Sequence, residues 1–409
     1  MLNLIHYRHC ARCYVSLGEI LFKDYKGKEM ILSIESSCDD SSIALVSIND
    51  ARLIYHLKLS QDEEHSSYGG VVPEIASRLH CQRLPQLFNR LKTFLHNDFS
   101  SLKAIAVTTR PGLSVTLIEG LMMAKTLALS LHLPLICVNH LKGHIYSLFI
   151  KQSPTLPQSS FVSAHFNENT QDCAQESLQS QIKAYLPLGI LLVSGGHTQI
   201  LSMRGANDIS LVAQSLDDSF GESFDKVAKY LNLGYPGGPI VESYAKDFMQ
   251  NYPHITPHSF PVPLLHNHQL QFSFSGLKNA VRIAITALEK PYIAQDIGSI
   301  CAGFQKSACE HILRKVRLFF QGKEAQNLTH FAIVGGASAN TYLRQEMEKL
   351  CVEFGKTLVL APLEFCADNA AMIGVCAIEQ YQRGDFTPLH QAQVSPKSLP
   401  SDFYKETHS

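Results

Sequence analysis

A repeated strand pattern restricts the fold of this chain more than any other feature of its sequence. Two parts of the chain each show apolar runs of strand length, separated by polar, turn-forming residues. The first part predicts strands at 31–35, 43–48 and 53–59, and the second predicts strands at 189–193, 199–203 and near 210–214. We therefore expect an internal duplication in which each copy opens on three strands joined by short turns.

Each set of strands is followed by alternating helical and strand patterns, which are typical of an α/β lobe. After the first set we expect a helix from Pro73, a strand at 104–108 and an amphipathic helix at 114–131. Two such lobes resemble the duplicated two-lobed fold of actin, the sugar kinases and Hsp70, the ribonuclease H-like ASKHA group. This resemblance implies an actin-like α/β fold with a nucleotide-like ligand in an interlobe cleft, an argument from fold alone.

Changes in composition predict the domain boundaries. Met30 directly precedes a strong strand, so we interpret residues 1–29 as an N-terminal extension or a start-site artefact. Cys10 and Cys13 in that segment offer too few ligands for a closed zinc site. The other expected parts are a first lobe at 30–150, completed by a C-terminal helix near 366–384, a polar insertion at 151–183, a second lobe at 184–365 and a tail at 385–409.

Composition excludes several classes of protein. With 45% hydrophobic and 17% charged residues among 409, the chain can bury a large core. Its formal net charge of -1 gives no overall attraction to polyanions, so any contact with RNA must come from local Lys and Arg patches. Eleven scattered cysteines suit reduced thiols in a cytoplasmic protein. The apolar stretch 113–135 is interrupted by Glu119, Lys125 and His132, which argues against a membrane span.

The sharpest local signal is His140-Leu-Lys-Gly-His144, because histidines at i and i+4 project from one helical face and can bind one metal ion. The alternative is a pair of partly buried histidines that only pack. A zinc protease motif would place Glu after the first His, where this chain has Leu141. Asp368 is our candidate third ligand, although its position before a helical pattern, taken alone, favours a first-turn or N-cap residue.

Two glycine-rich turns follow predicted strands and suit the binding of phosphate or carboxylate by backbone N–H groups. They are Ser194-Gly-Gly-His-Thr198 and Val334-Gly-Gly-Ala-Ser-Ala-Asn340, and the first equally suits an ordinary hairpin turn. Between them, Asp225 could accept ribose hydroxyls and Gly238 could lie against a ligand. The alternative for the helix that carries Asp225 is a solvated face with i,i+4 ion pairs.

Three further segments allow more than one role. Asp39 and Asp40 are adjacent carboxylates in the first turn, where they could hold a cation, position a reacting group or cap backbone N–H groups. The segments 65–80 and 272–279 mix aromatic and basic groups, so they could contact phosphates and stack on an extruded base, or simply pack.

These motifs together resemble one family, the catalytic subunit of tRNA threonylcarbamoyladenosine synthase, formerly described as a sialoglycoprotein endopeptidase. The resemblance runs from about Met30 to Gln382. The motifs that carry it are I-E-S-S-C-D-D-S, Y-G-G-V-V-P-E-I-A-S-R-L-H, P-G-L, H-L-K-G-H, L-V-S-G-G-H-T, F-D-K-V-A-K, Y-P-G-G-P, F-S-F-S-G-L-K and G-G-A-S-A-N. So many motifs in the same order are highly specific.

The resemblance implies an acyltransferase that moves the threonylcarbamoyl group from threonylcarbamoyl-AMP to N6 of adenosine 37 in tRNAs that read codons starting with A, releasing AMP. It implies His140, His144 and Asp368 as ligands of one divalent metal ion per subunit, iron (Fe²⁺) or zinc. The residues implied as contacts to the adenylate are Leu192, Val193, Ser194, Gly195, Gly196, Asp225, Gly238 and Asn340.

The resemblance also implies partners: tRNA, a paralogous non-catalytic subunit and a small P-loop ATPase. The catalytic base is unknown, and Asp39 and Asp40 are weak candidates for it. Three rival functions remain. An actin-like kinase would not need paired histidines, a non-catalytic subunit would be expected to lack them, and an endopeptidase would need a glutamate after His140.

Overall fold

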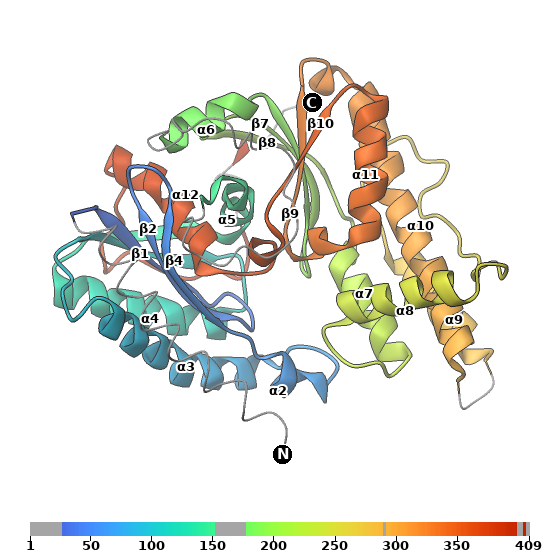
Figure 1. Cartoon of the computed structure of the whole chain (residues 1–409), viewed down its shortest axis with the longest axis horizontal. Helices are drawn as coiled ribbons and strands as arrows, with labels where there is room; N and C mark the ends of the chain where they lie inside the picture. The colour runs from blue at the N-terminus through green and yellow to red at the C-terminus, as the bar shows by residue number, and fades with distance from the viewer. Residues whose placement is uncertain (1–26, 152–176, 289–291, 399–403, 406–409) are drawn as a thin grey trace. The chain divides into compact units, whose positions relative to one another are not determined.

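The computed structural model describes residues 27–151, 177–288, 292–398 and 404–405, and Figure 1 shows its course. Most of the predicted extension at 1–29 and of the predicted insertion at 151–183 lies outside the described residues, as does most of the predicted tail beyond 398. The described chain divides into two compact units. The first contains 27–60, 73–151, 177–180 and 369–398, and the second contains 61–72, 181–288, 292–368 and 404–405.

A five-stranded mixed sheet forms the centre of the first unit, in the order β3-β2-β1-β4-β5. Its strands are β1 (Met30–Glu35), β2 (Ser41–Ser47), β3 (Leu53–Leu59), β4 (Leu102–Arg110) and β5 (Leu135–Asn139). β1 pairs antiparallel with β2 and parallel with β4, and β2 and β3 are antiparallel while β4 and β5 are parallel. All four strands predicted from the sequence in this region are present.

Helices cover both faces of this sheet, which is why every residue of the central strand β1 is buried. Ile34 belongs to an apolar cluster with Leu84 and Leu121, which come from the helices on one face. On the other face, Ser33 Oγ donates to Ala370 O at 2.6 Å. The helices of this unit are α3 (Pro73–Phe94), α4 (Ser114–Leu131), α5 (His140–Tyr146), η1 (Ser147–Phe149) and α12 (Ala370–Arg383).

The second unit repeats the first sheet. Its six strands run in the order β10-β9-β6-β7-β8-β11, and the central strand β6 is antiparallel to β7 and parallel to β9, as β1 is to β2 and β4. The strands are β6 (Leu188–Val193), β7 (Thr198–Gly205), β8 (Asp208–Gln214), β9 (His330–Val334), β10 (Thr357–Leu360) and β11 (Tyr404–Lys405). The predicted duplication is confirmed, and the chain has a duplicated actin-like α/β fold.

Phenylalanine side chains fill much of the second core. The rings of Phe220 and Phe224 lie 4.8 Å apart, and Phe224 meets Phe304 at the same distance. The helices that supply and surround this core are α7 (Phe220–Tyr230), α8 (Gly237–Asn251), α9 (Ser275–Thr286), α10 (Ala294–Gln321) and α11 (Thr341–Glu353). The remaining short helices are α2 (Asp62–Ser66), α6 (Leu178–Tyr185), η3 (Lys323–Ala325), η4 (Gly336–Ala339) and η5 (Leu363–Phe365).

Helix α4 is the one helix among the described residues that is long and apolar enough to cross a membrane. Its side chains Leu117, Leu121 and Ala124 are buried at 0 to 5% exposure. The helix packs on β4 and α3 of the first unit, while its apolar side chains Ile118, Met122 and Leu129 are exposed.

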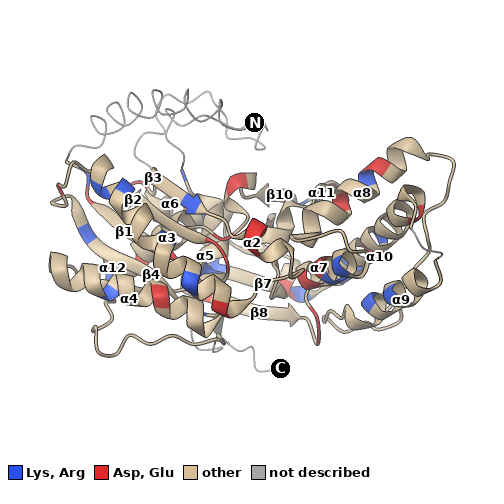
Figure 2. Cartoon of the chain, turned by 90° about the horizontal axis from the view of Figure 1, so that it is seen from below, with Lys and Arg blue, Asp and Glu red and all other residues tan. Residues whose placement is uncertain are grey.

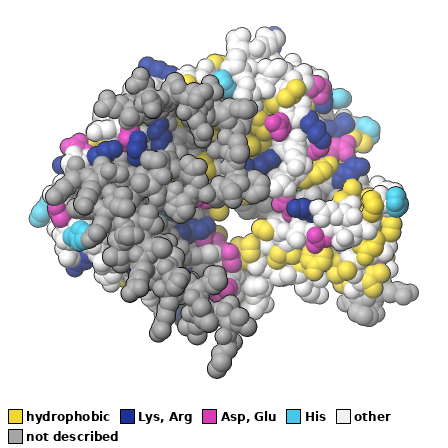
Figure 3. All heavy atoms as spheres, in the orientation of Figure 1, with side chains coloured by type: hydrophobic (Ala, Val, Ile, Leu, Met, Phe, Trp, Pro, Cys, Tyr) yellow, Lys and Arg dark blue, Asp and Glu magenta, His cyan; other side chains and the backbone are white. Residues whose placement is uncertain are grey.

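Charged side chains of both signs are interspersed over each unit, as Figure 2 shows along the helices and strands. The same mixture is visible on the face drawn in Figure 3. This distribution agrees with the net charge of -1. RNA binding therefore requires local contacts rather than a uniformly basic face.

Packing of α12 on the first sheet gives a stability prediction. A Cβ atom on Gly374 would lie 2.6 Å from Val46 Cγ2 and 2.8 Å from Ser33 Oγ. We expect Gly374→Ala to lower the free energy of unfolding by about 1–3 kcal/mol through overpacking, measured by chemical denaturation. The matched control is Gly276→Ala, because a Cβ there meets no atom within 4 Å. Equal stability of the two variants would contradict this packing.

Candidate metal centre and glycine loops

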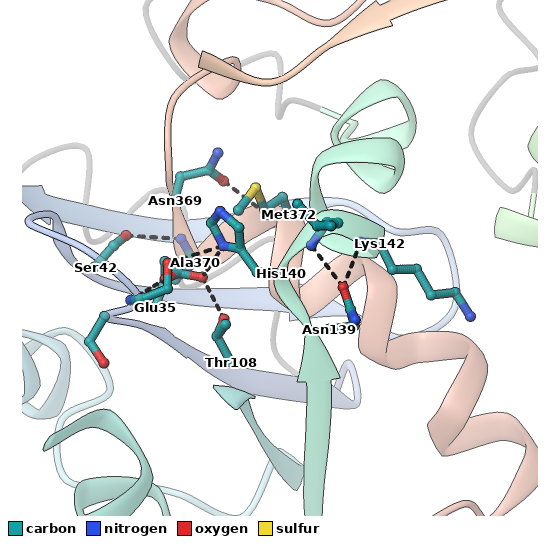
Figure 4. Close-up of polar contacts among 12 residues, drawn as sticks. Glu35, Ser42, Thr108, Asn139, His140, Lys142, Asn369, Ala370 and Met372 are labelled. Atoms are coloured by element: carbon teal, nitrogen blue, oxygen red, sulfur yellow. Dashed lines mark hydrogen bonds and ion pairs between the residues drawn. The ribbon is translucent and has the colours of Figure 1, made fainter. Parts of the chain in front are cut away.

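The two histidines of the H-x-x-x-H motif lie on one face of a short, well-capped helix. The strand β5 ends at Asn139, whose side chain accepts hydrogen bonds from Leu141 N at 2.9 Å and Lys142 N at 3.3 Å. This N-cap begins α5 directly at His140 (Figure 4). His144 follows one turn later, and the two ring centroids are 4.6 Å apart. The predicted helical placement of the pair is confirmed.

The residues between the histidines hold α5 against α12. Gly143 permits close approach, because a Cβ there would lie 2.8 Å from Ile373 Cδ1. The buried Lys142 Nζ is 3.6 Å from Glu379 Oε2, and Tyr146 donates its hydroxyl to the same oxygen at 2.5 Å. Burial, with the neighbouring carboxylate, raises the pKa of Tyr146 well above its ordinary value. The motif therefore fixes the helix as well as supplying the histidines.

Asp368 lies beside the pair and is not the N-cap of α12 that its position in the sequence alone favoured. The side chain that caps α12 is that of Asn369, which accepts from Met372 N at 2.9 Å. The peptide bond to Asn369 places Asp368 at the start of α12. One possible ligand atom from each of His140, His144 and Asp368 lies within 4.8 Å of the other two.

This set of donors fits a transition metal. Two imidazoles and one carboxylate are a ligand set of catalytic zinc sites and of iron(II) sites, and both leave coordination positions open to another molecule. The ligand atoms are close enough to surround a single ion. The group can therefore hold a metal ion, and its composition does not distinguish iron from zinc.

Glu35 belongs to the same centre, and the sequence analysis gave it no role. It ends β1, is fully buried, and brings Oε2 to 3.2 Å from His140 Nδ1 (Figure 4). Thr108 Oγ1 also donates to Oε2, and Ser37 N donates to Oε1 at 2.6 Å. The signal that could have found it is a carboxylate at the end of an otherwise apolar, fully buried strand.

The paired carboxylates Asp39 and Asp40 lie in the turn between β1 and β2, as the sequence predicts. Asp40 Oδ2 is 2.7 Å from Lys58 Nζ, and the Asp40 side chain is 13% exposed. The ion pair engages one carboxylate oxygen of Asp40.

His80 holds the same turn from α3. Its Nε2 lies 2.9 Å from Cys38 O and its Nδ1 lies 2.7 Å from Ser41 Oγ. Burial lowers the pKa of His80, which favours the neutral ring. His80 at the end of the segment 65–80 is thus a structural residue.

In the second unit, the first glycine turn follows the end of β6. Leu192 and Val193 are buried within the strand, so their side chains pack in the core. The turn then packs on the start of α7, where Ser219 Oγ donates to Gly195 O at 2.6 Å. Ser194 is 9% exposed at the beginning of this turn.

Glycines near this turn serve two different purposes. At Gly195, Gly196 and Gly238 an added Cβ would meet no atom within 4 Å, so backbone is open to an approaching group. At Gly335 φ is +94°, and a Cβ would lie 2.3 Å from Val193 O. Gly335 is therefore required for chain packing, whereas the first three leave space for a ligand.

Asp225 Oδ1 accepts a hydrogen bond from Gly237 N at 2.8 Å, which holds the start of α8 against the middle of α7. The neighbouring Lys226 and Glu222 form an i,i+4 ion pair at 3.5 Å, both about two-fifths exposed. That pair confirms a solvated face, while Asp225 faces the glycine-rich start of α8.

Asn340 has a structural role at the second glycine turn. Its Oδ1 accepts from Leu343 N at 2.8 Å, and its Nδ2 donates to Gln305 Oε1 at 2.9 Å. Thr341 N donates to Glu242 Oε1 at 2.7 Å. The N-terminus of α11 is thus already capped by protein groups, so any anion at this turn would have to meet the loop 335–339.

The two segments considered for RNA stacking differ in exposure. Phe272 and Phe274 are fully buried, so the aromatic groups of 272–279 pack in the core and cannot stack on a base. In the other segment His65 and His80 are also buried, whereas Tyr68 is 54% exposed. Tyr68 is the aromatic side chain of these segments that is available for stacking.

Comparison with known proteins identifies relatives along nearly the whole chain. Residues 52–170 and 168–375 match the family model described as tRNA N6-adenosine threonylcarbamoyltransferase. Curated proteins of that name are 71% identical in Helicobacter hepaticus and 54% identical in Helicobacter pylori strain G27, each over 91% of this chain and 100% of the relative. The protein of that name from Wolinella succinogenes is 52% identical over 90% of this chain and 99% of its own.

Solved structures with low sequence identity share the fold. Full-length HypF in a phosphate- and nucleotide-bound form matches with a TM-score of 0.50 and 14% identity. The match covers 88% of this chain and 57% of that chain. This likeness supports the duplicated actin-like fold.

If these three residues hold one metal ion, substitution of a ligand residue should cause loss of the bound metal. We expect His140→Ala and Asp368→Asn to reduce metal from about one ion per chain to a trace, because two protein ligands hold a divalent ion weakly. Metal content after gel filtration, measured by inductively coupled plasma mass spectrometry, tests this. His254→Ala removes an exposed histidine and is the control. Full metal content in both ligand variants would show that the ion binds elsewhere.

Proposed function

This chain belongs to the tRNA N6-adenosine threonylcarbamoyltransferase family, and we propose that it transfers the threonylcarbamoyl group of threonylcarbamoyl-AMP to N6 of adenosine 37 in tRNA. The tRNAs would be those that read codons starting with A. The observation that carries the proposal is the convergence of His140, His144 and Asp368 in a chain 71% identical to a named member of the family.

In the proposed reaction, the lone pair of N6 attacks the carbonyl carbon of the threonylcarbamoyl group. A new N–C bond forms, the bond from that carbon to the phosphate oxygen breaks, and AMP leaves with the electron pair. N6 then loses one proton to a base. The products are N6-threonylcarbamoyladenosine and AMP. Because both reactants are preformed, the main task of the protein is to position them.

His140, His144 and Asp368 would hold the metal, one ion of Fe²⁺ or Zn²⁺ per subunit. When bound, such an ion supplies a positive charge that orients and polarises oxygen groups of a ligand. The fit rests on the short distances between the three ligand atoms and on the burial of both histidines.

The adenylate would meet the second unit at the open glycines. Backbone at Gly195, Gly196 and Gly238 can approach a phosphate or a ribose closely, since no side chain would be in the way there, and Leu192 to Ser194 would position the first two from the end of β6. Asp225, which already orders the start of α8, could accept a ribose hydroxyl. The side chain of Asn340 already bonds to Leu343 and Gln305. A contact with the adenylate at this position would therefore be made by the backbone around Asn340.

Asp39 and Asp40 are our candidates for the base that accepts the N6 proton. Lys58 Nζ lies 2.7 Å from Asp40 Oδ2, and an adjacent ammonium group favours the ionised carboxylate. Both lie in the turn that His80 ties to α3. A positioned base contributes about 10²- to 10⁴-fold to such a step.

Partners of this chain would be tRNA, a paralogous non-catalytic subunit and a small P-loop ATPase, as the family resemblance implies, and the site of action would be the cytoplasm. Tyr68 is the exposed aromatic group that could stack on a base of the tRNA.

The endopeptidase alternative finds no support in α5, where the residue after His140 is the buried Leu141.

A reconstituted transfer assay tests the function. Purified protein is mixed with unmodified tRNA, the two partner proteins, ATP, threonine, bicarbonate and the enzyme that forms the carrier, and modified nucleoside is measured by mass spectrometry. We expect product from the wild type and from His254→Ala, and little from His140→Ala. No product from folded, metal-loaded wild type would contradict the proposal.

Variants of the turn test the base. Asp39→Asn should lower the transfer rate by about 100-fold or more, and it should leave metal content unchanged. Asp40→Asn is the matched comparison, and it also removes the ion pair with Lys58. Unchanged rates in both variants would remove these aspartates as bases.

A further inference from the structure

Glu35 is a buried carboxylate that the proposed reaction does not use. It is fully buried at the end of β1, where an ionised group loses the solvation of water. A buried carboxylate is tolerated when hydrogen bonds and a charge partner replace that solvation. The chain retains one here although every other residue of β1 is Met, Ile, Leu or Ser. The contacts of its two oxygens show what it does.

Both oxygens of Glu35 accept hydrogen bonds from fixed donors. Ser37 N donates to Oε1 at 2.6 Å, and Thr108 Oγ1 from the adjacent strand β4 donates to Oε2. His140 Nδ1 lies 3.2 Å from the same Oε2 (Figure 4). An ionised carboxylate can only accept, so this contact is satisfied when His140 donates from Nδ1.

The direction of that hydrogen bond decides which ring nitrogen can bind metal. A neutral imidazole carries one proton, and a proton on Nδ1 leaves the lone pair on Nε2. Nδ1 is directed to Glu35, with Ser37 Oγ also 3.1 Å away. Nε2 is therefore the atom of His140 that is left for the group formed with His144 and Asp368.

We propose that Glu35 is a positioning residue that holds the proton on His140 Nδ1 and so presents Nε2 as the metal ligand. The proposal rests on the metal centre of the proposed function and adds the residue that orients it. A carboxylate behind a ligating histidine fixes the ring and makes the ligand nitrogen more basic. Glu35 is not itself one of the three candidate ligands.

Glu35→Gln tests the proposal because it keeps the size of the side chain and reverses one hydrogen bond. Ser37 N still requires an oxygen, so the new NH₂ group takes the place of Oε2 and faces His140. His140 Nδ1 then becomes the acceptor and the proton moves to Nε2, where it blocks metal binding. We expect metal affinity to fall about 10- to 100-fold.

Two measurements detect the change of His140 tautomer and of metal affinity without an activity assay. Histidine ¹⁵N shifts of metal-free protein report the tautomer, with the His140 signal assigned by its loss in His140→Ala. Metal affinity is measured by competition with a chromophoric chelator, using Zn²⁺ and then Co²⁺, whose visible absorption reports the ligand geometry. We expect a proton on Nδ1 in the wild type and on Nε2 in Glu35→Gln.

Thr108→Val is the matched control. It removes the other side-chain hydrogen bond to Oε2 and keeps the carboxylate next to His140. We expect it to keep the Nδ1 proton and an affinity within about threefold of the wild type, a much smaller change than loss of the orienting group gives. Thermal unfolding of all variants verifies that each is folded.

The outcomes separate this inference from the metal centre itself. Loss of metal in His140→Ala with wild-type affinity and an unchanged tautomer in Glu35→Gln would overturn the role of Glu35 and keep the centre. Retention of metal in His140→Ala would overturn the centre. An equal loss of affinity in Thr108→Val and Glu35→Gln, with the Nδ1 proton kept in both, would show that Glu35 only supports the fold.

Discussion

Close packing of α5 on α12 is the constraint on which the candidate site depends. α5 is only seven residues long, and a helix of this length has little stability of its own. Its position comes from Gly143 against Ile373 and from the buried group of Lys142, Glu379 and Tyr146. Because α12 begins at Ala370, two residues after Asp368, the contact that holds the histidines also places them beside that carboxylate.

The two copies of the duplicated sheet carry different chemistry at equivalent places. The central strand β1 ends in Glu35, which leads into a turn rich in carboxylates and reaches the histidine of the metal group. Its counterpart β6 ends in Val193 and leads into a glycine turn with open backbone. One fold thus places the paired histidines in the first unit and open glycine backbone in the second.

Much of the fold could be predicted because the chain repeats its strand pattern and both central strands are buried on both faces. The placement of His140 and His144 on one helical face followed from their spacing. The role of Asp368 could not be decided by spacing, because two adjacent polar residues both suited the helix start, and only the contact from Met372 N shows that Asn369 is the cap. Glu35 was missed because its partners Thr108 and His140 are distant in sequence.

The remaining expectations show where sequence patterns were ambiguous. Aromatic residues at 272–279 suited stacking as well as packing, and burial of Phe272 and Phe274 decides for packing. The second glycine turn suited an anion at a helix start, but Asn340 and Glu242 already cap α11. In both cases the deciding contact comes from a residue that local sequence does not reveal.

The most direct test of the central claim is anomalous X-ray diffraction from crystals of the metal-loaded protein, recorded across the iron and zinc absorption edges. The account predicts one strong peak about 2.0–2.2 Å from Nε2 of His140 and from an oxygen of Asp368, with His144 as the third ligand. Its element would identify the metal. A peak at another site, or a metal bound by Nδ1 of His140, would contradict the account.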